Sequence, residues 1–279
     1  MGFLKELFRL TRFEHALMLA FAVLIAETVV LGALPPLSLV IVLSLLVPIF
    51  SEMGSFALND YLDIEADKAN KMMERPLVKG TISAGFALWF SVACLVISVA
   101  LALFINLPAF LIALVFNLLA VAYNYRLKDL PLVGNAYIAL TMAIPFLFGN
   151  YVVSGTLSPI ILVLAVLGFV AGLAREVIKS VQDMEGDLKA RGSKTLPILV
   201  GKEAALRIAI VLYLMFIPLT ALPFYMGLKF GALPVGFIGL ADLIIIAVCY
   251  KAGEKDFRFA RNASLVAFLL GMAGILAAL

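Results

Sequence analysis

Two acidic clusters carry the residue types and the spacing that could do chemistry. The first lies in NDYLDIEADKANKMMERPLVK, where Asn59, Asp63 and Asp67 recur every four residues. On a helix such residues stack on one face across two turns, so their oxygen-bearing side chains would point the same way. The second, VQDMEGDLKARGSKTLP, repeats this spacing with Asp183 and Asp187. Rows of oxygen ligands indicate the binding of hard divalent cations.

Positive charge accompanies these acids. Carboxylates that face one another beside an apolar cavity would repel unless cations lay between them. Magnesium is favoured because it takes oxygen ligands and commonly bridges carboxylates to phosphates. The basic side chains that could bind a pyrophosphate are Arg12, Arg75, Lys128, Arg175 and Lys179. The one histidine, His15, argues against zinc or haem, since such sites usually need several His or Cys ligands.

Some of these residues also have a purely structural interpretation. Arg175, Lys179 and Asp183 are spaced by four and form one helical stripe, which must face protein or water because it continues from an apolar run. They could instead form ordinary ion pairs at a helix end, Lys179 with Asp183 and Arg175 with Glu176. Arg12 could anchor the chain at the membrane interface or contact an anionic substrate.

The composition defines the frame that must position these side chains. Of the 279 residues, 64% are hydrophobic and 14% are charged, whereas soluble domains are roughly 45–50% apolar. Apolar runs of about 17–25 residues can cross a hydrocarbon layer of roughly 30 Å, and runs this long are helical. Nine such runs fall near residues 13–34, 37–58, 84–105, 108–124, 133–153, 158–180, 204–226, 232–250 and 260–278. We therefore predict an all-α polytopic membrane protein with nine transmembrane helices around a central cavity.

The loop charges predict the orientation in the cell membrane. Lys and Arg lie at the N-terminus and after the second, fourth, sixth and eighth runs, whereas the other connections carry Lys229 as their only basic residue. By the positive-inside rule, the N-terminus and both acidic clusters are expected to be cytoplasmic, and an odd number of spans places the C-terminus outside. The formal net charge of +3 then reflects this topology and anionic lipid headgroups, not a nucleic-acid partner.

We expect residues 1–279 to form a single transmembrane domain with a loose internal repeat. The runs 37–58 and 158–180 are each followed by Asp-x-x-x-Asp, a basic loop and a proline-containing element, RPLVKG or LPILVGK. This indicates two related helix-loop units, about 13–130 and 131–279. Two acid-bearing loops would then face one another on one side of the membrane.

A ligand with a diphosphate head and a long hydrocarbon tail suits both halves of this arrangement. The metal and the cations would bind the diphosphate, and a bundle embedded in the membrane would offer the tail an apolar channel. Allylic diphosphates react when the leaving pyrophosphate is stabilised, so that the C–O bond ionises to an allylic cation that an acceptor attacks. The pattern therefore predicts a prenyltransferase.

The same motifs resemble a known family. The two clusters, the RPL after the first of them and the LPLVGN after the fourth run are similar to the UbiA superfamily of intramembrane prenyltransferases, over nearly the whole chain. The resemblance implies that two magnesium ions on the diphosphate are held by Asn59, Asp63, Asp67, Asp183 and Asp187. It implies that Arg12, Arg75 and Lys128 contact the diphosphate oxygens. Tyr123, which could otherwise be an interfacial aromatic residue, would lie near the reacting centre.

Within the superfamily, REVIKSVQDMEGDLKARGSKTLP looks most like archaeal digeranylgeranylglyceryl phosphate synthases. These transfer a geranylgeranyl group from its diphosphate to the free hydroxyl of geranylgeranylglyceryl phosphate, making the second ether bond of archaeal lipids. The phosphate of that acceptor would explain the additional charge of Arg175 and Lys179. By this resemblance, the residues expected to act in the transfer are Asp63, Tyr123, Lys179 and Asp183.

Alternative functions remain open. The TRFEH opening departs from the RP-x-N start of many members and is more like quinone-pathway relatives, so an aromatic acceptor such as 4-hydroxybenzoate is the alternative substrate. An ion-coupled transporter would use the intramembrane acids Glu27, Glu52 and Asp242 as its relay. Transporters place their crucial polar groups near the midplane, however, whereas the dense charge here lies at one interface. A lipid-binding scaffold would leave the spacing of the acids unexplained.

Glu52 has two interpretations of its own. It lies seven residues before Asn59, two turns away on nearly the same helical face. It could therefore line the same cavity or belong to a structural hydrogen-bond network.

Overall fold

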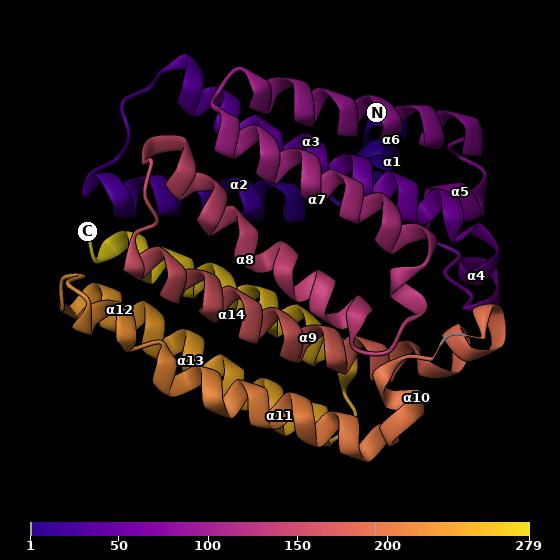
Figure 1. Cartoon of the computed structure of the whole chain (residues 1–279). Coiled ribbons are helices and arrows are strands. Elements are labelled where there is room, and N and C mark those ends of the chain that lie inside the picture. The colour runs from indigo at the N-terminus through magenta and orange to yellow at the C-terminus, as the bar shows by residue number, and fades with distance from the viewer. Residues whose placement is uncertain (1, 193) are drawn as a thin grey trace.

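All regular secondary structure in the part of the chain that the structure describes is helical. The computed structural model describes residues 2–192 and 194–279, without the side chains of residues 187, 190 and 191. The side chain of Asp187, an expected metal ligand, therefore lies outside the described residues. Figure 1 shows the long helices lying roughly parallel or antiparallel in one bundle.

Nine helices of the described chain are long and apolar enough to cross a membrane. They are α2 (Phe13–Leu31), α3 (Leu39–Leu62), α6 (Ala84–Leu103), α7 (Leu107–Tyr125), α8 (Val133–Val153), α9 (Pro159–Arg191), α11 (Lys202–Leu219), α13 (Ala232–Gly253) and α14 (Phe257–Ala277). The predicted all-α membrane fold is thus confirmed. The main difference is α9, which continues past the predicted boundary at residue 180 and carries the second acidic cluster on the helix itself.

Short helices gather where the acidic clusters lie. Figure 1 shows α4 (Ile64–Ala69), α5 (Pro76–Lys79) and α10 (Leu196–Val200) at one end of the bundle, which we call the motif end. The 3-10 helix η1 (Leu127–Asp129) connects α7 to α8 beside them. The remaining short helices are α1 (Gly2–Thr11), which packs against α3 and α5, and α12 (Leu222–Tyr225) at the opposite end.

Local sequence sets where several spans begin and end. The side chains of Ser38, Ser83 and Asn106 accept hydrogen bonds from the backbone N–H groups three residues further on, which is the capping that Ser and Asn provide. α2 is followed by Gly32, whose φ of 70° lies in the left-handed region that favours glycine. These ends fix the lengths of the spans.

The first acidic cluster lies on two helices and not on the single helix we expected. α3 ends at Leu62 and α4 begins at Ile64, with Asp63 between them at φ −100° and ψ 8°. The backbone N–H of Asp63 still donates to the Asn59 carbonyl at 2.9 Å, and that of Asp67 donates to the Asp63 carbonyl at 2.7 Å. The four-residue hydrogen-bond spacing therefore survives the break.

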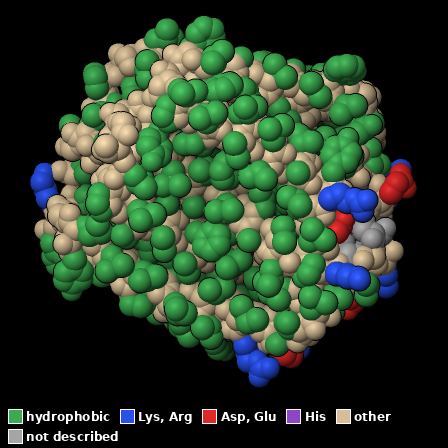
Figure 2. Space-filling view, viewed as in Figure 1, with side chains coloured by type: hydrophobic (Ala, Val, Ile, Leu, Met, Phe, Trp, Pro, Cys, Tyr) green, Lys and Arg blue, Asp and Glu red, His purple; other side chains and the backbone are tan. Residues whose placement is uncertain are grey.

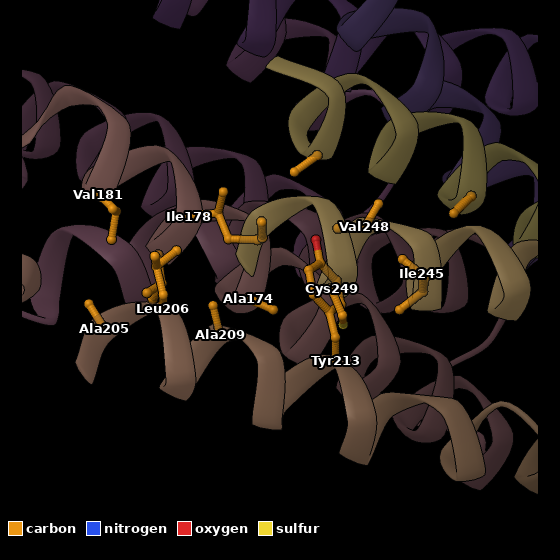
Figure 3. Packing of buried hydrophobic residues seen from close by; sticks show 14 of the residues in the cluster. Ala174, Ile178, Val181, Ala205, Leu206, Ala209, Tyr213, Ile245, Val248 and Cys249 are labelled. Carbon is orange, nitrogen blue, oxygen red and sulfur yellow. The ribbon is translucent and has the colours of Figure 1, made fainter. Parts of the chain in front are cut away.

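Apolar packing joins the second half of the bundle. Figure 3 shows the buried cluster between α9, α11 and α13, to which Ile178, Leu206 and Ile245 belong and in which Tyr213 is fully buried. In the first half, the Ser91 hydroxyl of α6 donates to the Gly54 carbonyl of α3 at 2.7 Å. Interhelical hydrogen bonds of this kind help to hold helices together in a membrane.

α2 and α8 approach each other closely at a glycine. A Cβ at Gly149 would lie 2.6 Å from the Val23 carbonyl oxygen, so a larger residue would push the two helices apart. Small residues serve this purpose at membrane helix contacts. α8 is thereby held beside α2.

The flank of the bundle suits a lipid environment. Figure 2 shows hydrophobic side chains covering this face, with charged side chains gathered toward the motif end. Large apolar side chains such as Trp89, Leu118 and Leu243 are 72%, 61% and 64% exposed. Contiguous apolar surface of this extent marks a membrane or protein contact.

Candidate active site

A polar pocket at the motif end is lined by both acidic clusters. Asp63 and Asp67 reach it from the first cluster, and Asp183 reaches it from α9. Two motifs that are distant in the sequence therefore face the same space. The other polar residues of the lining are Asn59, Asn70, Arg75, Tyr123, Lys128, Asn135, Glu176, Lys179, Ser180 and Thr195.

Most of the residues selected from the sequence meet in this pocket. Those present are Asn59, Asp63, Asp67, Arg75, Tyr123, Lys128, Lys179 and Asp183. Arg12 and Arg175 are not among the lining residues. Arg175 is buried, and its Nε has no hydrogen-bond partner among the described residues.

Asp63 is held from two sides. Lys128 Nζ lies 2.5 Å from Asp63 Oδ1, and Asn59 Nδ2 donates to Asp63 Oδ2 at 2.9 Å. The same Asn59 amide donates to Asn124 Oδ1 at 3.0 Å, which ties the end of α3 to α7. The Asp63 side chain is thus positioned by both a cation and an amide.

Asp60 is the centre of a second ion-pair network. Its Oδ1 lies 2.5 Å from Arg75 Nη1 and 3.0 Å from Arg12 Nη2, and the residue is only 2% exposed. Arg75 Nη1 also lies 2.9 Å from Asp67 Oδ2. Arg75 is therefore shared between a buried acid behind the pocket and an acid that lines it.

Arg12 reaches this network from the other side. It lies at the junction of α1 and α2 with a positive φ of 42°, and its guanidinium stacks over the Phe56 ring at 4.2 Å. Burial lowers the pKa of Arg12, whereas the neighbouring Asp60 carboxylate raises it. Arg12 thus binds the acid that positions Arg75.

Burial also changes the acid-base properties of Asp67. Desolvation raises the pKa of this carboxyl to about 6, against the opposing effect of Arg75. Its Oδ2 is ion-paired with Arg75, although the geometry does not qualify as a hydrogen bond. We interpret Asp67 as an oxygen ligand whose ionised form is destabilised by burial unless a further cation is present.

The α9 wall of the pocket carries charge of both signs. Lys179 Nζ lies 3.2 Å from Glu176 Oε1, and the Asn135 amide of α8 donates to the Ser180 hydroxyl at 2.7 Å. Lys179 therefore pairs within its own helix. This end of α9 is held to α8 by the Asn135 to Ser180 hydrogen bond.

The sequence did not single out Asp60, Asn135 or Ser180. Asp60 lies next to Asn59 but outside the four-residue rows that guided the selection. The sequence signal for Asp60 was an acidic residue directly after an apolar run, because a buried carboxylate needs a cationic partner. Asn135 was visible within LPLVGN, whereas Ser180 carries no signal of its own.

Two apolar cavities lie deeper in the bundle. Residues of α2, α3, α8, α9, α11, α13 and α14 line the larger one, and residues of α2, α3, α6, α7 and α8 line the smaller one. α3 connects the regions, because it carries Asn59 to the polar pocket and Glu52 to both cavities. Tyr123 of the pocket stacks on Tyr137 of the smaller cavity, with ring centroids 4.7 Å apart.

The pocket has the donor chemistry of a divalent-cation site, compensated by basic side chains. Within the described part of the chain, no group of three or more His, Cys, Asp and Glu residues could hold a metal ion by itself. Lys128 pairs with Asp63, and Arg75 pairs with Asp67. Oxygen donors compensated in this way fit a ligand that brings both negative charge and its own counter-cations.

Comparison with known proteins places the chain in a family. The model of the UbiA prenyltransferase family matches residues 16–270. The chain therefore belongs to the UbiA prenyltransferase family, and the resemblance drawn from the motifs is confirmed.

Curated relatives narrow this class. The chain is 35% identical over 285 residues to the digeranylgeranylglyceryl phosphate synthase of Archaeoglobus fulgidus, covering 99% of this chain and 95% of the relative. It is 36% identical over 251 residues to the enzyme of the same name from Thermococcus kodakarensis, covering 87% of each chain.

Solved structures share the architecture. One of them has a TM-score of 0.72 at 27% identity, and the match covers 99% of this chain and 100% of the other. It is described as giving structural and mechanistic insights into the biosynthesis of digeranylgeranylglyceryl phosphate synthase in membranes. A UbiA homolog from Archaeoglobus fulgidus bound to DMAPP and Mg2+ has a TM-score of 0.68 at 25% identity, with 97% and 99% covered.

Proposed function

We propose that this protein is a digeranylgeranylglyceryl phosphate synthase. It transfers the geranylgeranyl group of geranylgeranyl diphosphate to the free hydroxyl of geranylgeranylglyceryl phosphate in archaeal ether-lipid synthesis. The observation that carries this proposal is the meeting of both acidic clusters at one polar pocket, beside apolar cavities suited to hydrocarbon tails. The names of its relatives support the choice of substrates.

Magnesium is the metal that fits the donor set. Asn59, Asp63, Asp67 and Asp183 offer oxygen ligands to the pocket, and Asp187 belongs to the same set by its spacing. When bound, magnesium would supply a Lewis acid that stabilises the charge of the leaving pyrophosphate. The carboxylates would then exchange their basic partners for the ion, which frees those basic groups for the diphosphate.

The basic residues of the pocket would bind and orient the diphosphate. Lys128, Arg75 and Lys179 reach the lining from three different segments of the chain. Their charge would stabilise the pyrophosphate oxygens as the allylic C–O bond ionises. Tyr123 also lines this pocket, and an aromatic ring there would stabilise a nearby cation.

Arg12 would act indirectly. Its ion pair with Asp60 and the Asp60 pair with Arg75 make it a positioning residue for Arg75. Direct contact between Arg12 and the diphosphate, and between Arg175 and the acceptor phosphate, stay predictions from the family resemblance.

The membrane orientation follows the loop charges. We propose that the motif end faces the cytoplasm, because the basic loops are concentrated there. A water-soluble pyrophosphate product would leave on that side.

Product analysis tests the proposed function. The purified protein in lipid vesicles with Mg2+ is given labelled geranylgeranyl diphosphate together with geranylgeranylglyceryl phosphate and 4-hydroxybenzoate in equal amounts. Mass spectrometry should find the diether phosphate as the dominant prenylated product. Prenylated 4-hydroxybenzoate as the dominant product would contradict the proposal and support the aromatic alternative.

A further inference from the structure

Glu52 lies where the two apolar cavities meet. It lines both of them, and it shares this property with Leu19 and Thr141. It lies seven residues before Asn59 on α3, which is ~10 Å along the helix axis at about 1.5 Å per residue. An ionisable side chain is thus placed below the polar pocket, between two spaces suited to hydrocarbon.

The Glu52 side chain is half-buried and borders both cavities. The hydrogen bonds found among the described residues do not include this side chain. Arg12 attracts it electrostatically, but the Arg12 guanidinium donates its hydrogen bond to Asp60 at 3.0 Å. Acids kept at membrane depth without a structural partner point to a function.

The other two intramembrane acids each accept a hydrogen bond through one carboxylate oxygen, while the second oxygen, Glu27 Oε2 or Asp242 Oδ1, is buried without a partner among the described residues. Glu27 is fully buried, accepts a hydrogen bond from Ser44 at 2.5 Å and is absent from the lining of both cavities. Asp242 accepts a hydrogen bond from Thr220 at 3.0 Å and lines the larger cavity alone. Of these three acids, only Glu52 contacts both spaces.

The proposed reaction needs a group at such a junction. Each of its two substrates carries one geranylgeranyl tail, so the new ether bond forms where two tails meet close to the diphosphate. An alcohol that attacks an allylic carbon must also lose its proton. His15 lines the larger cavity only and packs edge-to-face on Phe56, with ring centroids 5.7 Å apart.

We propose that Glu52 contacts the acceptor hydroxyl at the junction of the two cavities and takes its proton. This inference rests on the proposed function. The allylic C–O bond breaks and its electron pair leaves with the pyrophosphate, while a lone pair of the hydroxyl oxygen forms the new C–O bond. The O–H electron pair stays on that oxygen, and the proton passes to a Glu52 carboxylate oxygen and then to water after product release.

The experiment compares Glu52→Gln with Glu27→Gln in vesicles that contain Mg2+ and both proposed substrates. Ether product, free prenyl alcohol and pyrophosphate are each measured. E52Q should lower the kcat for ether formation about 100-fold or more, the usual size of a general-base effect. The KM of each substrate should stay within a few-fold, and donor consumption should continue with prenyl alcohol as the product. E27Q should keep the wild-type product ratio.

Several outcomes would overturn this role. Wild-type ether kcat in E52Q, a selective rise in the donor KM of E52Q, or an equal loss in E27Q would each do so while leaving the proposed function in place. A wild-type protein that prenylates only 4-hydroxybenzoate would overturn the proposed function and the role of Glu52 together.

Discussion

The side chain of Asn70 lies against the backbone of Gly186, where an added Cβ would be 1.5 Å from Asn70 Oδ1. Asn70 caps the end of α4 and Gly186 lies within α9. The contact joins the end of the first acidic cluster to the helix that carries the second. A larger residue at position 186 would therefore require the Asn70 side chain to move.

Gly186→Ala should displace the Asn70 side chain, which lines the polar pocket between the clusters. We expect prenyl transfer to fall about tenfold or more, since a displacement of about 1 Å near a site can cost up to ~100-fold. The helix content in detergent should be unchanged. Steady-state assays and circular dichroism would measure the two quantities.

Two further variants make this test specific. Gly239→Ala changes a helical glycine whose Cβ would meet no atom within 4 Å, so it should retain full activity. In the N70A/G186A double variant, activity should equal that of N70A alone because the clash has been removed. A double variant as impaired as the product of the two single effects would contradict the proposed contact.

Asp60→Asn should destabilise the motif end. The change leaves Arg12 and Arg75 without their shared buried carboxylate. We expect a loss of about 3 kcal/mol in the free energy of unfolding, the low end for breaking a buried pair because both arginines keep partial exposure. Thermal melting in detergent would show this as a lower midpoint, together with a higher KM for the donor.

Glu65→Gln is the matched control for Asp60. It removes an acid from an ion pair with Lys68, whose side chain is 51% exposed while that of Glu65 is 86% exposed. Exposed pairs contribute only about 0–1 kcal/mol. Equal melting shifts for D60N and E65Q would show that Asp60 does not organise the site.

The sequence allowed the membrane fold and most of the pocket to be predicted, because both depend on patterns along the chain. Hydropathy marks the spans, and the spacing by four marks acids that share a helical face. The partner of each acid depends on contacts between helices that are far apart in the sequence. The Asp60 network and the role of Arg12 were therefore not predictable from spacing.

One prediction from the sequence was wrong, and another is not tested by the structure. We expected one helix through Asp63 because Asn59, Asp63 and Asp67 keep a regular four-residue spacing. That spacing does not indicate where a helix ends. The duplication of two helix-loop units stays a prediction.

Removal of divalent ions should stop the reaction. Chelation by EDTA should abolish ether formation, and added Mg2+ should restore it, because the carboxylates of the pocket would repel a diphosphate in the absence of cations. Mg2+ with pyrophosphate should also raise the melting midpoint. A ligand at 100 times its Kd adds about 2.7 kcal/mol to the free energy of unfolding.

The control in this melting experiment is pyrophosphate without Mg2+. It should give a smaller melting shift than the pair, since only the basic residues would then bind it. Full activity after complete chelation, or an equal shift without Mg2+, would contradict the assignment of a metal to this pocket.

Binding of an unreactive donor tests most directly whether both acidic clusters act on one diphosphate. Geranylgeranyl thiolodiphosphate would be titrated with Mg2+ into the wild-type protein, Asp63→Asn, Asp183→Asn and the control Glu203→Gln, whose exposed pair with Lys255 lies outside the pocket lining. We expect one site per chain and a loss of affinity of about tenfold or more in D63N and in D183N, as for a lost charged contact of about 1.5–3 kcal/mol, with none in E203Q. Wild-type affinity in either aspartate variant, or two independent sites, would contradict the account.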